Sequence, residues 1–306
     1  MSFGYRLLGF GSGGSELTAA TGGTEGKFEG YKFHEFKSSG TFTVLMDYDF
    51  DILMIGGGGS GGNTNGGGGG SGGFVYYSAK TLAVGDYTVV IGAGGVSGYY
   101  SPYNGDYTGG QDGEDTTFTG LTTAVGGGGG GAGASATGND QHGQDGGSGG
   151  GCGSTWLAGN EGVGTSNQGN NGGYGDGTIA SSGGGGATAA GTNGIGDLSG
   201  TGGVGINEGD TVYNFNGGGT VTLPQLHSQS NRNYAGGGGG GGGTSSSTYG
   251  GWPGGGGRGR KEWSGLNGRA NSGSGGGGGG SRTGTGANDG KGGPGGSGIV
   301  RIRYAV

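Results

Sequence analysis

Apolar and polar side chains alternate along the segment from Phe42 to Met54. Every even position is apolar or aromatic: Phe42, Val44, Met46, Tyr48, Phe50, Ile52 and Met54. The odd positions include Thr43 and three aspartates, Asp47, Asp49 and Asp51. A period of two is typical of strands that bury one face. The pattern predicts strands here, with a turn near 47–51, and a preceding strand that contains Phe28, Tyr31, Phe33 and Phe36.

Two further blocks carry the β-branched and aromatic residues that strands favour. The block from Gly73 to Gly92 has a turn signal at Gly85-Asp86, which predicts a hairpin. The last block runs from Ile299 to Val306. Its alternation predicts a strand with Val300, Ile302 and Tyr304 facing inward and with Arg301 and Arg303 facing outward.

Glycine dominates the chain between these blocks. The chain has 306 residues, of which 103 are glycine and only 4 are proline. Collagen needs glycine at every third position and abundant proline, whereas these glycines occur in runs, so collagen is excluded. A hydrophobic share of 27% suggests disorder, but 15 Tyr, 10 Phe and 3 Trp argue against it. The longest runs are Gly126–Gly131, Gly183–Gly186, Gly236–Gly243 and Gly275–Gly280.

These runs predict packed polyglycine II helices. Such a helix has three residues per turn and no internal hydrogen bonds, so its N–H and C=O groups point sideways. Buried groups of this kind need partners, and without Cβ atoms several helices can lie close enough to bond to one another. The alternative is a flexible Gly/Ser linker. Linkers are usually short and seldom contain isolated Trp and Tyr residues.

The candidate chemistry does not indicate an enzyme or a cofactor. Ser60 and Ser71 fit Gly-x-Ser-x-Gly formally, but that motif needs a strand-to-helix turn and a histidine partner, and the three histidines (His34, His142 and His227) are scattered. No Gly-Lys-Ser/Thr follows a glycine run, which argues against a phosphate-binding loop. We therefore predict a protein without catalytic activity.

The charged residues do not predict a metal site or nucleic-acid binding. The aspartates at 47, 49 and 51 lack the rest of a calcium loop, and Asp112, Glu114 and Asp115 leave calcium as a minor alternative. Cys152 and His142 lack the four ligands of structural zinc. Residues 257–306 carry eight Lys/Arg and two Asp/Glu, a net +6, which leaves −13 for the rest of a chain whose total is −7. Because an acidic body repels phosphate, we expect the basic region to dock on an acidic neighbour.

Isolated aromatic residues in the glycine territory are the candidate binding residues. Rigid rings among Gly, Ser and Asn are typical of recognition surfaces. The alternative is that each ring shields the open side of the glycine bundle. The candidates are Trp156, Tyr174, Trp252, Trp263, Tyr99, Tyr100, Tyr103 and Tyr107.

The order of these blocks resembles the glycine-rich domain found at the ends of bacteriophage tail fibres and in related virion proteins. The match consists of Phe50-Asp-Ile-Leu-Met-Ile followed by glycines, the block that ends Tyr-Thr-Val-Val-Ile-Gly-Ala-Gly-Gly, Gly113-Glu-Asp-Thr-Thr-Phe, and the C-terminal Gly298-Ile-Val-Arg-Ile-Arg-Tyr. It covers the chain from Lys27 to the end. The extracellular glycine-rich region of anaplastic lymphoma kinase is similar in design.

The resemblance implies an all-β fold: a small jelly-roll-like β-sandwich (27–95 and 296–306) with a polyglycine II bundle and loops (56–73 and 92–295). Residues 1–26, with Phe3, Tyr5, Leu7, Leu8 and Phe10, lie outside the resemblance; we expect an attachment segment here, and the alternative is an added strand of the sheet. Neither a signal peptide nor a membrane span is expected. The implied protein is a virion component whose partners are other virion proteins and a host receptor, with a homotrimer as the usual fibre assembly. The alternative is a structural decoration protein without receptor binding.

Overall fold

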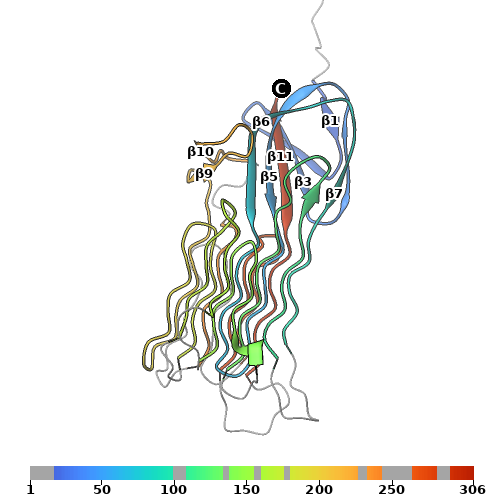
Figure 1. Ribbon diagram of the computed structural model, residues 1–306. Coiled ribbons are helices and arrows are strands. Elements are labelled where there is room, and N and C mark those ends of the chain that lie inside the picture. The colour runs from blue at the N-terminus through green and yellow to red at the C-terminus, as the bar shows by residue number, and fades with distance from the viewer. Residues whose placement is uncertain are drawn as a thin grey trace, which may run out of the picture.

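The computed structural model describes residues 17–98, 108–133, 138–154, 160–175, 180–226, 233–242, 264–280 and 290–306. Within these residues the fold has two parts, a β-sandwich and a bundle of extended glycine-rich segments that leaves one end of the sandwich (Figure 1). The only helical turn among them is η1 (Gly138–Gln141), so the predicted all-β class is confirmed. No helix in the described part is long and apolar enough to cross a membrane.

The sandwich consists of two antiparallel sheets. The first has the order β1 (Ala20–Thr21), β4 (Gly40–Val44), β7 (Gly85–Val90) and β8 (Thr117–Phe118). The second has the order β2 (Thr24–Phe28), β3 (Tyr31–Phe36), β11 (Ile299–Ala305), β5 (Tyr48–Ile55) and β6 (Phe74–Leu82). A small hairpin of β9 (Thr211–Tyr213) and β10 (Thr220–Thr222) lies beside β6. The predicted boundary at residue 26 falls inside β2.

The main core lies between the two sheets and follows the predicted alternation. Phe42 from β4 and Phe50, Ile52 and Met54 from β5 are fully buried in it, and Val300, Ile302 and Tyr304 join them from β11. Met46 departs from the pattern because it lies in the turn between β4 and β5, where its side chain is exposed. The alternation therefore located both strands, and the turn between them comes slightly before the predicted position.

The predicted hairpin within residues 73–92 is wrong. β6 pairs with β5, from Tyr48↔Leu82 to Ile55↔Phe74, and β7 pairs with β4 and β8 in the other sheet. The reason is that β5 and β6 continue into a long glycine hairpin, residues 56–73, which fixes them as neighbours. The short turn at 83–84 therefore connects the two sheets.

The outward face of β11 is covered, which corrects the prediction for Arg301. A second apolar cluster packs on this side of the sheet, and its covering residues are Ile206, Val212, Leu223, Leu226 and Tyr234. Arg301 is 1% exposed beneath it, with its Nη2 2.5 Å from Oε2 of Glu35. Arg303 is partly buried and donates from Nε to Asp51 at 2.9 Å. Both arginines of β11 are thus paired within the protein.

Hydrogen bonds in the bundle repeat every third residue. In the run from Gly56 to Gly62, residues three apart donate to the same neighbouring segment at 2.9 Å. The donor and acceptor pairs are Gly57–Glu114 and Ser60–Gln111, Gly58–Gly296 and Gly61–Gly293, and Gly59–Gly70 and Gly62–Gly67. A strand would instead alternate between two sides. A threefold period with sideways bonds is the polyglycine II conformation, so the linker alternative does not apply to these residues.

The run from Gly66 to Gly73 lies at the centre of the bundle. Its N–H groups donate to three segments and its C=O groups accept from three others. The six neighbours are 125–131, 182–185, 273–279, 56–62, 148–151 and 236–241. The backbones lie so close that a Cβ on Gly69 would stand 2.2 Å from the carbonyl oxygen of Gly59. Glycine is therefore the packing residue of this interior.

The predicted structural glycines lie in these interior segments wherever the structure describes them. Those described are Gly126, Gly131, Gly183, Gly186, Gly236, Gly275 and Gly280, and all are buried. A Cβ on Gly126, Gly131 or Gly183 would meet a backbone oxygen at 1.9 Å. Gly243 lies outside the described residues.

Candidate functional site

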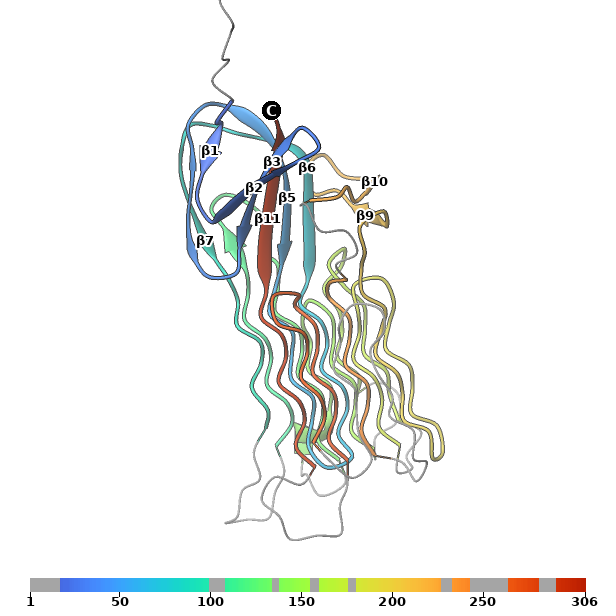
Figure 2. The same ribbon diagram turned by 180° about the vertical axis from the view of Figure 1, so that it is seen from behind.

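The bundle has one end at the sandwich and a free end, which we call the tip (Figures 1 and 2). The turn at 187–190 is at the sandwich end, since Ala187 packs against the second apolar cluster. The glycine segment before the turn at 195–198 leads away from the sandwich, and the segment after the turn leads back to it. This turn is therefore at the tip. The turn at 63–65, which joins the glycine extensions of β5 and β6, is there as well.

The turn at Ile195–Leu198 exposes two aliphatic side chains. Ile195 and Leu198 bond to each other in both directions, each N–H donating to the other's carbonyl at 2.9 Å. Gly196 supplies the left-handed conformation that this tight turn requires, with φ of 57°. Ile195 is 65% exposed and Leu198 is 54% exposed. A rigid turn therefore holds a pair of large apolar side chains in solvent.

Tyr174 lies on the segment next to this turn. Its carbonyl accepts a hydrogen bond from Gly194 N at 3.0 Å, and its N–H donates to Oδ1 of Asn193 at 3.1 Å. Its ring is exposed. We call Tyr174, Ile195 and Leu198 the tip patch. One predicted aromatic residue thus stands beside two aliphatic residues that sequence reasoning missed.

The other predicted aromatic residues lie outside the described part of the chain: Trp156, Trp252, Trp263, Tyr99, Tyr100, Tyr103 and Tyr107. Two described residues that flank these undescribed stretches lie at the tip. Thr108 contributes a carbonyl to Nδ2 of Asn63 at 3.1 Å, and Ser154 donates from its N–H to the carbonyl of Asn65 at 3.1 Å.

Asn63 stiffens the tip from within. Its side chain is almost completely buried, and besides the bond to Thr108 its Oδ1 accepts from Gly292 N at 2.8 Å. The next residue, Thr64, donates from its N–H to Gly290 at 2.7 Å. One turn thus joins segments that are far apart in the sequence. Side chains near this turn are attached to backbone that is already ordered, so little backbone entropy is lost when a partner binds them.

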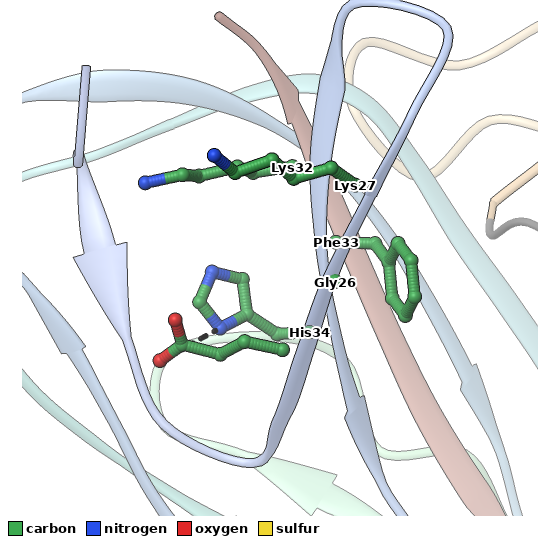
Figure 3. A pocket seen from close by; sticks show the side chains of 6 residues that line it. Gly26, Lys27, Lys32, Phe33 and His34 are labelled. Atoms are coloured by element: carbon green, nitrogen blue, oxygen red, sulfur yellow. Dashed lines mark ion pairs between the residues drawn. The ribbon is translucent and has the colours of Figure 1, made fainter. Parts of the chain in front are cut away.

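A pocket of about 180 Å³ lies on the β-sandwich, between the β2–β3 hairpin and β1 (Figure 3). His34 points into it below Lys27 and Lys32, while Phe33 turns to the opposite side of the strand. Nδ1 of His34 donates to the Gly22 carbonyl at 2.8 Å, and burial lowers the pKa of the ring. Glu25 also lines the pocket, and no serine, threonine or cysteine does.

The acidic candidates accept hydrogen bonds from backbone N–H groups and from one side-chain hydroxyl. Asp112 and Asp115 accept from the N–H groups of Gly129 and Gly126, each at 2.8 Å, and so cap the edge of the bundle. Asp47 accepts from Val84 N at 2.9 Å, and Asp49 accepts from the Thr81 hydroxyl at 2.6 Å. Within the described residues no group of three His, Cys, Asp or Glu side chains is arranged to hold a metal ion.

The expected basic face is smaller than the charge count suggests. Arg301 and Arg303 are paired with carboxylates inside the fold. Four other basic residues of this region, Arg258, Arg260, Lys261 and Arg282, lie outside the described part.

Comparison with known families gives one match. Residues 35–305 match the model of a family described as a glycine-rich domain. A search among curated proteins found no match.

Proposed function

We propose that this chain, which belongs to the glycine-rich domain family, is a non-enzymatic phage virion protein of a tail fibre or tail tip that binds a host surface receptor. The tip of the bundle would contact the receptor. The β-rich end with its N-terminal segment would hold the protein to other virion proteins. In this proposal the chain lies on the particle surface.

The tip patch is the observation that carries the proposal. Large apolar side chains held in solvent by a rigid turn lose little entropy on binding and bury apolar area when a partner covers them. Ile195 and Leu198 are not needed to close the bundle, because their turn is made by backbone bonds. Their exposure is therefore better explained by a partner than by folding.

The test is host adsorption by particles that carry Ile195→Ser together with Leu198→Ser. We expect adsorption to fall about tenfold or more, since anchors at the centre of an interface contribute 1–2 kcal/mol or more each. The matched control is Val163→Ser, which changes a comparably exposed aliphatic residue on another segment. Both variants should keep the melting temperature of the parent protein.

A second variant examines the aromatic residues that the structure does not describe. Replacement of Trp156, Trp252 and Trp263 by alanine should also reduce adsorption while particles still assemble. If neither variant changes adsorption, and if the particle carries hundreds of copies, the decoration role replaces the receptor-binding role.

A further inference from the structure

The sandwich end opposite the bundle carries an exposed apolar surface. Leu45, Met46 and Val84 are 50%, 40% and 63% exposed, and we call them the end patch. They lie in the two turns that close this end, and these turns touch, since Val84 N donates to Oδ1 of Asp47 at 2.9 Å. Three large aliphatic side chains on adjoining turns are more than the scattered apolar residues of an ordinary surface.

The described chain begins beside this patch. Leu45 N donates to the carbonyl of Ala19 at 2.8 Å, and Ala20 pairs with Val44. Residues 1–16, which the structure does not describe, are therefore tethered next to Leu45. They contain the apolar residues Phe3, Tyr5, Leu7, Leu8 and Phe10, followed by Gly11-Ser-Gly-Gly-Ser.

Tether length and charge both favour this segment as the occupant. The seven residues from Gly11 to Leu17 are rich in Gly and Ser, and a Gly/Ser-rich stretch of this length has a root-mean-square span of roughly 15 Å, which keeps residues 3–10 at a high local concentration near the patch. Arg6 is the only charged side chain within residues 3–10. Asp47 in one of these turns and Asp86 at the start of β7 place carboxylates near the end patch, so the charges are complementary.

We propose that residues 3–10 cover the end patch of the same molecule. The contact would bury aromatic and leucine side chains against Leu45, Met46 and Val84, which otherwise face solvent. This inference concerns the end of the sandwich and does not depend on receptor binding at the tip. The β-rich end with residues 3–10 folded onto it would then be the surface that meets other virion proteins.

Hydrogen exchange of the full-length protein, followed by mass spectrometry on peptides from residues 1–16, tests the proposal. In the parent protein the amides of residues 3–10 should exchange about tenfold more slowly than an unstructured peptide of the same sequence. The triple variant Leu45→Ser, Met46→Ser and Val84→Ser should remove this protection. A control triple variant, Val96→Ser, Val163→Ser and Leu266→Ser, changes exposed aliphatic residues elsewhere and should leave it intact.

Three results would overturn the proposal. Unprotected amides in the parent protein would leave the end patch to another virion protein. Protection that survives the end-patch variant would place the segment elsewhere. Protection that grows with protein concentration would make the occupant the segment of a second copy. Because the substituted side chains are exposed, the variants should fold, and an unchanged melting temperature checks this directly.

Discussion

A single methyl group at Gly238 should open the glycine bundle. A Cβ at this position would lie 1.9 Å from the carbonyl oxygen of Gly276, whereas real Cβ contacts are essentially never closer than 3.0 Å. The obstructing atom belongs to backbone and cannot rotate away. Gly238→Ala must therefore push two helices apart by about 1 Å or more.

The cost follows from the hydrogen bonds that cross this contact. Between the two segments Gly275 N donates to Gly236 at 2.9 Å and Gly278 N donates to Gly239 at 2.8 Å, and Gly238 N itself donates to Gly69 at 2.9 Å. A separation of about 1 Å breaks bonds of this length. At about 1 kcal/mol for each bond, the loss is about 3 kcal/mol, and more if the freed groups stay buried. For a chain of 306 residues that is a fall in melting temperature of roughly 5 °C.

Thermal unfolding of Gly238→Ala beside Gly40→Ala measures this cost. At Gly40 the nearest atom to the added Cβ is a Phe36 ring carbon at 3.5 Å, an ordinary contact, so this control should be neutral or slightly stabilising. If the two variants melted within 1 °C of each other, residues around Gly238 would behave as a linker and the packing argument would be refuted.

Three further predictions concern ionisable side chains, of which Cys152 and Arg301 are buried and Asp112 is exposed. Burial raises the pKa of Cys152 to about 11, so iodoacetamide at pH 8 should label it roughly a hundredfold more slowly than a free thiol, and equal rates would show that the bundle opens readily. Arg301→Met should lower the free energy of unfolding by about 1.5–3 kcal/mol because it leaves Glu35 with Lys37 as its remaining cation, and adding Glu35→Leu should recover much of the loss; denaturant titrations that show no recovery would contradict the pairing. Partial desolvation raises the pKa of Asp112, so the native state holds this proton more tightly and stability falls as pH rises from about 4 through the folded pKa. Asp112→Asn, which keeps an acceptor for Gly129 N, should gain stability relative to the parent between pH 4 and pH 7, and a gain that does not change with pH would contradict this assignment.

Local patterns in the sequence predicted the strands but not all of their partners. The alternation around Phe50 depends only on which face of a strand is buried, so it located β4 and β5. The glycine hairpin 56–73 continues both β5 and β6 and sets their pairing. A turn signal at Gly85 carries no information about which strand β6 pairs with. Arg301 was expected in solvent because the apolar residues that cover it could not be recognised from the sequence. They are dispersed over residues 206–235 and form no long alternation of apolar and polar positions.

The tip could be predicted only in part. Tyr174 stood out because an aromatic ring among glycines has no strand to join. Ile195 and Leu198 were missed because each is a single aliphatic residue, and only the turn brings them together. The available signal was the sequence Ile195-Gly-Asp-Leu198, an apolar pair around a turn dipeptide in a region without strands.

The direction of the hydrogen bonds determines how this protein carries mechanical load. The bonds of the bundle run across its long axis, and the glycine helices 56–62, 66–73 and 290–298 continue directly into β5, β6 and β11. A force pulling the tip away from the sandwich is therefore directed along the helices, and it shears many crosswise bonds at once. Rupture along this axis requires them to fail together, whereas a sideways force could separate one helix at a time.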